Sequence, residues 1–254
     1  MVDALRKWGP LIGRRDQRRL TSEYRVIKRP LLNNARNTAE RSVRFGNLLM
    51  VASAVADEGK SFTAVNLSLS MAAETDCMVV LVDGDCIRAR LTELFGVRGA
   101  LGLTDLLQDP KLALENVVIP TNVPNLSFLP AGRRLERAVE LLASARMRNL
   151  CAALSQTPQR LIVFDSSPLL LTAEAPALAS QVGQIVVVVR ADRTPQQAVL
   201  AAIGKLDLAK PVGLILNQAT AGLSSLSYDS YGVYAQDYYD RVDARAAPTS
   251  SGAT

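Results

Sequence analysis

The sequence predicts an α/β fold, a doubly wound and mostly parallel sheet with helices on both faces. The chain has 254 residues, 48% of them hydrophobic, which suits one large α/β domain. Its short apolar runs are rich in Val, Ile and Leu and do not alternate with polar residues, as in strands that are buried on both faces. Stretches with helical spacing separate these runs, and such strand–helix alternation builds right-handed βαβ units.

The expected elements begin after residue 46. The runs expected to form strands are 47–53, 78–82, 126–129, 161–164, 185–189 and 212–216. The helical stripes expected between them are formed by Phe62, Val65, Leu69 and Ala72 and by Leu141, Met147 and Leu150. In such sheets ligands bind at the carboxyl ends of the strands, so the residues that follow each strand are the candidates for a site.

The charge divides the chain into three expected parts: a basic N-terminal arm (1–45), a globular domain (46–222) and a flexible, tyrosine-rich C-terminal tail (223–254). Residues 1–50 hold 12 Lys and Arg against 4 Asp and Glu, whereas the remainder holds 17 against 20. The arm contains a helical pattern that we expect Pro30 to interrupt. It could contact anionic lipid, nucleic acid or an acidic partner, or it could be a solvated helical extension.

Composition excludes several classes of protein. No apolar run approaches the ~20 residues that a membrane-spanning helix needs, and the first 20 residues show no signal-peptide pattern. We therefore expect a soluble, intracellular protein. The sequence has no histidine and three cysteines that lie far apart, so neither a zinc site nor a disulfide framework is indicated. Any catalysis must use carboxylates, Lys, Arg, Ser, Tyr or a bound metal ion.

A phosphate-binding loop follows the first expected strand. The chain continues there as "SAVADEGKS", and Gly59-Lys60-Ser61 opens the next helix. In a P-loop the backbone N–H groups wrap the phosphates, the lysine reaches the β- and γ-phosphates and the hydroxyl binds Mg²⁺. Ala54 stands where the full pattern has its first glycine, but the position between a buried strand and a helix supports the prediction. The cofactor-binding residues expected from this loop are Ala56, Asp57, Glu58, Gly59, Lys60, Ser61 and Phe62.

Carboxylates follow two more strands. Asp83 and Asp85 come directly after "VVLV", and Asp165 follows "LIVF" in a Walker B pattern. A single aspartate at a strand end is often only a helix cap, but two that lie close together repel each other and favour a cation. All three belong to the same edge of the sheet as the P-loop, which predicts a Mg²⁺–nucleotide site. Asn217 ends a further strand there, where its amide could read a base.

These motifs resemble those of the bacterial tyrosine kinases, a P-loop family. That family combines a Walker A loop of the form A-x-x-P-G-[DE]-G-K-[ST], a D-x-D motif with a nearby arginine, a Walker B motif D-[ST]-x-P and a tyrosine-rich tail. Here they read "AVADEGKS", "DGDCIR", Asp165-Ser166-Ser167-Pro168 and "SYDSYGVYAQDYYD". The resemblance covers about 20–240 and is closest to the separate cytoplasmic autokinases of exopolysaccharide and exosortase gene clusters. It implies the P-loop NTPase fold, similar to that of the partition ATPases.

The resemblance also implies the cofactors, ATP and Mg²⁺, and a role for each site residue. Lys60 and the 56–61 backbone hold the phosphates, and Arg88 orders the site or meets a neighbouring subunit. Asp83 is the candidate base toward a tyrosine hydroxyl. The implied metal ligands are Ser61, Asp85 and Asp165. The implied catalytic residues are Lys60, Asp83, Asp85 and Asp165.

The tail and the arm acquire functions from the same resemblance. The implied phosphoacceptors are Tyr228, Tyr231, Tyr234, Tyr238 and Tyr239. In the family, kinase domains form homo-oligomeric rings in which one subunit's tail enters the next subunit's site, and residues 22–30 resemble the contact helix through Arg25 and Lys28. The resemblance further implies a separate membrane protein that regulates polysaccharide chain length as activator, a phosphotyrosine phosphatase, no nucleic acid, and a place at the inner face of the membrane.

Two departures from the family pattern keep other functions open. Ala56-Asp57 replaces Pro-Gly, so a carboxylate stands where phosphates approach, and we expect weaker ATP binding or slower turnover. Ser167 stands at the x position of D-[ST]-x-P, where the family usually has a further proline. One alternative is a P-loop ATPase of the partition or division-site type, although Val55 stands where that class has its signature lysine. The other is a nucleotide-dependent scaffold without tyrosine kinase activity.

Overall fold

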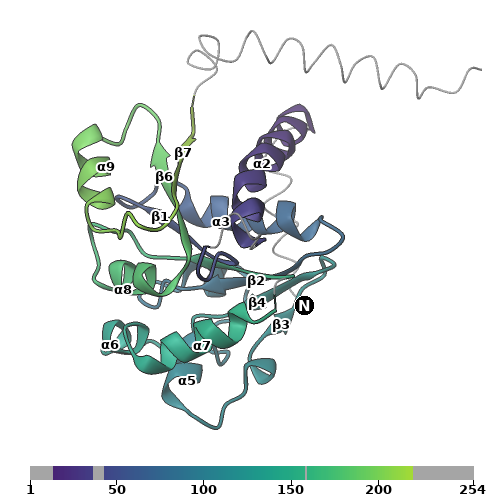
Figure 1. The fold of residues 1–254 in the computed structure, drawn as a ribbon, viewed down its shortest axis with the longest axis vertical. Helices are drawn as coiled ribbons and strands as arrows, with labels where there is room; N and C mark the ends of the chain where they lie inside the picture. Colours follow the sequence, from purple (N-terminus) through teal and green to yellow (C-terminus); the bar gives the residue numbers. More distant parts are fainter. Residues whose placement is uncertain (1–13, 37–42, 158, 220–254) are drawn as a thin grey trace, which may run out of the picture. The chain divides into compact units, whose positions relative to one another are not determined.

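The computed structural model describes residues 14–36, 43–157 and 159–219 and confirms the expected fold class (Figure 1). Seven strands form one sheet in the order β3-β4-β2-β5-β1-β6-β7. Every neighbouring pair is parallel except β3 and β4. The strands are β1 (Leu48–Ser53), β2 (Met78–Asp83), β3 (Ile119–Pro120), β4 (Leu126–Leu129), β5 (Arg160–Asp165), β6 (Gln184–Arg190) and β7 (Val212–Asn217).

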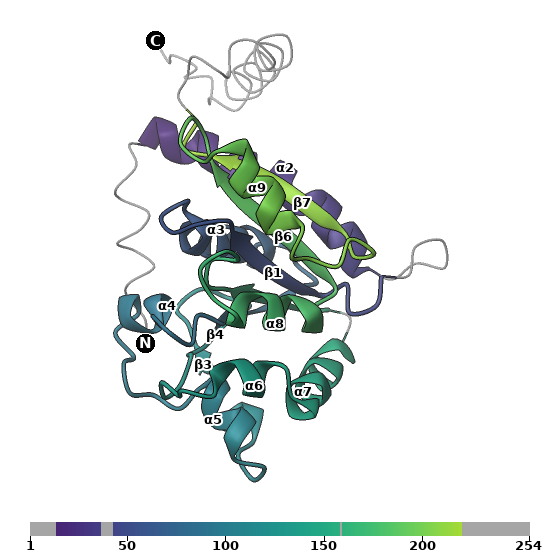
Figure 2. The same ribbon diagram turned by 90° about the vertical axis from the view of Figure 1, so that its left-hand side faces the viewer.

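Helices cover both faces of this sheet, as Figure 2 shows. They are α2 (Arg14–Ala35), α3 (Lys60–Ala72), α4 (Arg90–Leu94), α5 (Leu103–Gln108), the 3₁₀ turn η1 (Leu114–Asn116), α6 (Ala138–Leu142), α7 (Ala145–Ser155), α8 (Glu174–Gln181) and α9 (Gln196–Ile203). The stripe expected over residues 141–150 falls on two helices, because the Ser144 side chain accepts a hydrogen bond from the Met147 amide and starts a new helix there.

The core has two layers, one on each side of the sheet. Successive residues of β1 point to opposite faces: Leu48 and Met50 join the layer under α5 to α8, whereas Leu49 and Val51 join the layer under α2, α3 and α4. All four side chains are 3% exposed or less. This double burial explains why the central strands read as continuous apolar runs.

Two strands depart from the expectation. β3 was not expected, since it is only two residues long and one of them is a proline that can only occupy an edge. β7 was expected to be buried on both faces, but it is an edge strand whose Leu214 and Leu216 are 58% and 61% exposed. The expectation failed because an apolar run does not reveal whether a strand lies at the centre or at the edge of its sheet.

The helix α2 packs on α3 within the compact unit that ends at Asn217. It continues through Pro30 and does not stop there, because the turns beyond Pro30 bury Leu31, Leu32 and Ala35 in the core layer. Pro30 and Val26, whose carbonyl loses its helical partner, both face solvent, which reduces the cost of the missing bond. The proposed tail at 223–254 lies outside the described residues, and the three-part division stays a prediction.

Lys28 holds α2 against α3. Its side chain is 4% exposed, and its Nζ lies 2.7 Å from Glu74 Oε1 on the turn after α3. Arg29 approaches the same carboxylate at 3.9 Å but is 65% exposed. Arg25 and Lys28 are the two residues that resemble the family's contact helix. Arg25 faces solvent, whereas Lys28 is buried inside this chain.

Replacing Lys28 with methionine is expected to lower the free energy of unfolding by about 1–3 kcal/mol, because Glu74 then loses its buried partner. Arg29→Met, beside the same carboxylate, should cost less than about 0.5 kcal/mol. The Lys28 hydrogen bond holds the pKa of Glu74 below its ordinary value, so this stabilisation is present above that ordinary pKa and is lost as the pH falls through the folded one. Urea unfolding at neutral pH and at roughly pH 3 measures both effects; equal losses for the two variants would contradict this account.

Within the described residues, no helix combines the length and the apolar character that crossing a membrane requires.

Candidate functional site

The three motifs converge at the carboxyl ends of adjacent strands. β5 lies between β2 and β1 in the sheet, so the P-loop that follows β1 is next to the strand that carries Asp165. Asp83 and Asp165 are register partners at the last positions of β2 and β5. Asp85 follows two residues later and Asn217 ends β7. The structure therefore brings the expected residues to one edge of the sheet.

The P-loop has the backbone that phosphate binding requires. Gly59 precedes α3 with φ 93° and Asp57 has φ 62°, both in the left-handed region. Asp adopts this conformation more readily than most residues, which is why it can stand where the family has glycine. Within the part of the chain that the structure describes, no side chain caps the start of α3. Its first-turn amides, beginning at Lys60 and Ser61, are therefore directed at the position that an anion would take.

Glu58 braces the loop from inside and does not face the ligand side. Its side chain is buried, and Oε2 accepts a hydrogen bond from the Val55 amide at 2.7 Å. Oε1 accepts from the Thr194 hydroxyl at 2.5 Å and from the Arg190 amide at 3.4 Å. Asn217 adds a bond from Nδ2 to the Glu58 carbonyl at 2.8 Å. Glu58 and Asn217 thus tie the loop to the ends of β6 and β7; base reading by Asn217 stays a prediction.

Asp83 is hydrogen-bonded through one carboxylate oxygen and unpaired at the other. It is fully buried, and its Oδ2 accepts hydrogen bonds from the amide and the hydroxyl of Thr92, both at 2.7 Å. The Thr92 hydroxyl in turn accepts from the Ala131 amide at 2.9 Å. The other oxygen, Oδ1, has no hydrogen-bond partner among the described residues. Burial raises the pKa of Asp83 to about 6, against the lowering effect of the Thr92 hydrogen bonds.

Asp165 is the most strongly perturbed carboxylate of the site. It is fully buried, and within the described ranges neither oxygen has a hydrogen-bond partner. Burial raises its pKa to about 7, the Lys60 ammonium and the nearby Ser61 hydroxyl act in the opposite direction, and Asp83 and Asp85 add to the increase. Asp85 is also buried and accepts a hydrogen bond from the Arg88 amide at 3.1 Å. A cation would relieve this concentration of unpaired acceptors.

The residues fit a Mg²⁺–phosphate group but not an ion held by protein alone. Over the described part of the chain, no group of three or more His, Cys, Asp or Glu side chains is arranged to hold a metal. Mg²⁺ normally binds through one or two carboxylates, substrate phosphates and waters. The expected ligands Ser61, Asp85 and Asp165 suit that mode, because Ser61 lies in the first turn of α3, Asp165 ends β5 and Asp85 follows the end of β2 by two residues.

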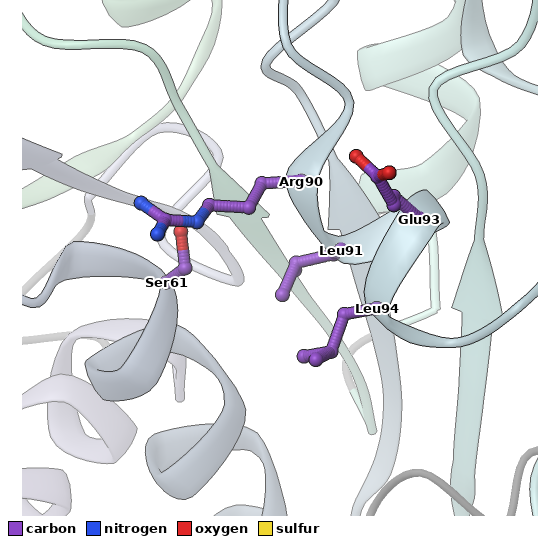
Figure 3. A pocket seen from close by; sticks show the side chains of 5 residues that line it. All are labelled: Ser61, Arg90, Leu91, Glu93 and Leu94. Atoms are coloured by element: carbon purple, nitrogen blue, oxygen red, sulfur yellow. The ribbon is translucent and has the colours of Figure 1, made fainter.

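Arg90 is a residue that the sequence pattern did not indicate. The pattern indicated Arg88, whose side chain is exposed and whose backbone amide donates to Asp85; its role stays a prediction. Arg90, at the start of α4, extends its guanidinium toward Ser61 (Figure 3) and lies 3.3 Å from Asp57 Oδ1. It lines both hollows beside the loop. One, of about 280 Å³, is lined by Ser61, Arg90, Leu91, Glu93 and Leu94. The other, of about 200 Å³, is lined by Asp57, Gly59, Lys60, Ser61, Phe62 and Arg90.

Thr92 can be tested as the support of Asp83. Thr92→Val keeps the shape but removes the hydroxyl that joins Asp83 to Ala131, leaving a buried amide without its acceptor. We expect the free energy of unfolding to fall by about 1–3 kcal/mol, and Thr92→Ser to restore most of it. Urea unfolding measures the change, and a valine variant as stable as the wild type would show that this hydroxyl contributes nothing.

A glycine-terminated loop at the start of a helix, with aspartates at the ends of the adjacent strands of a mostly parallel sheet, defines a P-loop enzyme that binds a nucleotide. The kinase domain of VpsO superposes on the chain with a TM-score of 0.66 and 27% identity, over 82% of this chain and 100% of that domain. A plasmid partition protein from Borrelia burgdorferi shares the fold, with a TM-score of 0.57 and 17% identity over 72% of this chain and 85% of its own.

Sequence relatives specify the family. Tyrosine-protein kinase YwqD of Bacillus subtilis (strain 168) is 30% identical over 190 residues, 73% of this chain and 76% of that protein. Tyrosine-protein kinase ptk of Acinetobacter johnsonii is 30% identical over 67% of this chain, which spans only 23% of ptk. No family model matches the sequence. The chain belongs to the bacterial tyrosine-protein kinases.

Proposed function

We propose that this chain is an ATP-dependent protein-tyrosine autokinase that phosphorylates the tyrosines of its own C-terminal cluster. The observation that carries the proposal is the uncapped start of α3 next to Asp83 and Asp165, whose buried oxygens lack partners within the described residues. Such an arrangement suits a phosphate group with its divalent cation. The family, the bacterial tyrosine-protein kinases, indicates the acceptor, a tyrosine hydroxyl. The five tail tyrosines lie outside the described residues.

Each site residue has a task in this proposal. Lys60 and the loop amides hold the phosphates, and Ser61, Asp85 and Asp165 hold Mg²⁺, which neutralises phosphate charge when bound. A tyrosine hydroxyl has a pKa of about 10 and is a weak nucleophile until its proton has an acceptor. The unpaired Oδ1 of Asp83 is that acceptor, because the opposite oxygen is already occupied by Thr92.

The tail and its partners complete the proposal. A flexible tail gives a high local concentration of acceptor, and in a ring-like homo-oligomer it would enter a neighbour's site. Arg25, exposed on α2, is available for such a contact. A role in exopolysaccharide synthesis or export, with a membrane-embedded activator, a phosphotyrosine phosphatase and a place at the inner face of the membrane, is supported by the motif resemblance.

The test is phosphotyrosine formation. Purified protein is incubated with Mg²⁺ and ATP and probed with an antibody against phosphotyrosine, beside Lys60→Met and a variant with Phe at all five tail tyrosines. We expect signal from the wild type alone. Nucleotide binding without phosphotyrosine would support the scaffold, and release of free phosphate with unmodified tyrosines would support the partition-type ATPase.

A further inference from the structure

Arg90 and Asp57 form an ion pair at the mouth of the P-loop that the proposed mechanism does not use. They lie 33 positions apart in the sequence, with Nη1 3.3 Å from Oδ1, and both side chains line the hollow that contains Gly59, Lys60 and Ser61. We infer that Arg90 is a phosphate-binding residue that Asp57 holds beside the loop until a bound phosphate replaces the carboxylate. The inference rests on the nucleotide binding of the proposed function and is independent of tyrosine phosphorylation.

The base of the Arg90 side chain is fixed by its neighbours. The next residue, Leu91, is fully buried, and Thr92 is bound to the buried Asp83 through both its amide and its hydroxyl. The preceding residue, Ala89, has φ 47°, which sets the direction in which α4 begins. The guanidinium itself is not enclosed by packing, since the side chain is 61% exposed, so only its pair with Asp57 would have to be broken for it to turn. A fixed base with a mobile charged end suits a residue that exchanges one anion for another.

The exchange is favoured because the present pair is weak. Both partners are mostly exposed, 61% for Arg90 and 71% for Asp57, and such pairs contribute at most about 1 kcal/mol. A phosphate offers more negative charge than a carboxylate and accepts two parallel guanidinium bonds. Glu93, which lines one of the hollows together with Arg90, is paired with Arg98 at 2.5 Å and therefore competes less for the guanidinium.

The pair also explains how this chain tolerates an aspartate in its loop. At φ 62° the Asp57 side chain projects from the turn that wraps the phosphates, where its charge opposes theirs. Arg90 offsets that charge while the site is free and turns to the phosphates when they bind. Removing Arg90 should therefore leave Asp57 unopposed, and removing the Asp57 charge should free Arg90.

Binding of a fluorescent ATP analogue to the full chain tests the inference, with Asp57→Asn, Arg90→Gln and the double variant. We expect Arg90→Gln to raise the Kd about 10-fold or more relative to the wild type, as for the loss of a charged hydrogen bond. The double variant should likewise have a higher Kd than Asp57→Asn alone. Asp57→Asn alone should lower the Kd several-fold. In Arg90→Gln, the Kd for inorganic tripolyphosphate, measured by displacement of the analogue, should rise by the same factor, because Arg90 contacts the phosphates and not the base.

The controls separate charge, folding and function. Arg148→Gln removes an equal charge from the exposed surface of α7 and should leave the Kd unchanged; Arg90→Lys should recover part of the loss. An unchanged Kd for Arg90→Gln in the Asp57→Asn background overturns the inference, since Arg90 would then only neutralise Asp57. Absence of binding by the wild type overturns it as well. Binding that Lys60→Met abolishes, without phosphotyrosine formation, refutes the kinase proposal and leaves this inference standing.

Discussion

Replacing Asp165 with asparagine is expected to stop phosphotyrosine formation and at the same time to stabilise the metal-free protein. Loss of a Mg²⁺ ligand should reduce the rate by roughly 10²–10³-fold, because a metal contributes several kcal/mol to such reactions. The gain in stability follows from burial: Asp165 is fully buried, and its oxygens accept no hydrogen bond within the described residues. Burial raises its pKa to about 7, although the nearby Lys60 ammonium and Ser61 hydroxyl act against that increase. At pH 8 in EDTA the ionised form destabilises the fold, and an uncharged amide should add about 1–3 kcal/mol.

Asp105 provides the matched control. It is equally buried, but its Oδ1 lies 2.5 Å from Arg133 Nε and its Oδ2 accepts the Gly102 amide at 3.0 Å. Asp105→Asn should therefore lower the free energy of unfolding by about 1–3 kcal/mol. Urea unfolding compares the two asparagine variants in EDTA, and the phosphotyrosine assay compares their rates with Mg²⁺ present. If Asp165→Asn destabilised the protein as Asp105→Asn does, the carboxylate would be paired in solution and its assignment to an open metal site would be wrong.

Replacing Glu58 with alanine is expected to abolish tight nucleotide binding although the side chain never faces the ligand. The change leaves the Val55 amide, the Arg190 amide and the Thr194 hydroxyl without their buried acceptor. Together these losses should cost about 2–4 kcal/mol of stability. The loop amides would also lose their fixed direction, so we expect the Kd for the nucleotide to rise about 100-fold or more.

A graded series separates positioning from direct contact. Thr194→Val removes one of the three bonds to Glu58 and should raise the Kd only about 2–5-fold. Glu58→Gln keeps one acceptor oxygen, so its Kd should lie between the Kd of Thr194→Val and the Kd of Glu58→Ala. Binding of the fluorescent ATP analogue gives the Kd values, and circular dichroism shows that each variant is folded. Equal Kd values for Glu58→Ala and the wild type would mean that the loop keeps its conformation without this brace.

Sequence reasoning predicted the fold and the placement of the candidate site because both depend on local patterns. All six expected runs are strands, and the aspartates stand at the ends of β2 and β5 where the pattern put them. In a parallel sheet the carboxyl ends of the strands lie at one edge, so the positions of the strands in the sequence are enough to predict that the residues following them lie close together. The same reasoning failed for β7, whose exposed Leu214 and Leu216 show that it lies at the edge of the sheet.

The side-chain contacts of the site could not be predicted in the same way. Glu58 belongs to the loop by sequence, but its partner Thr194 is 136 positions away, and Arg90 meets Asp57 across 33 positions. A lysine on a helix is usually solvated, but the packing of α2 buries Lys28 against Glu74. Each contact depends on how one element packs on another, which no local pattern specifies.

The sequence by itself therefore determined which chemical groups are available: the P-loop glycine and lysine, the strand-end aspartates and the tyrosines outside the described residues. Only the tertiary structure decided how they are used. Burial leaves Asp165 and one oxygen of Asp83 without partners, turns Glu58 into a brace and sets Arg90 opposite Asp57. The physical reason is that desolvation and pairing, which set the properties of a charged group, depend on neighbours that come together only when the chain folds.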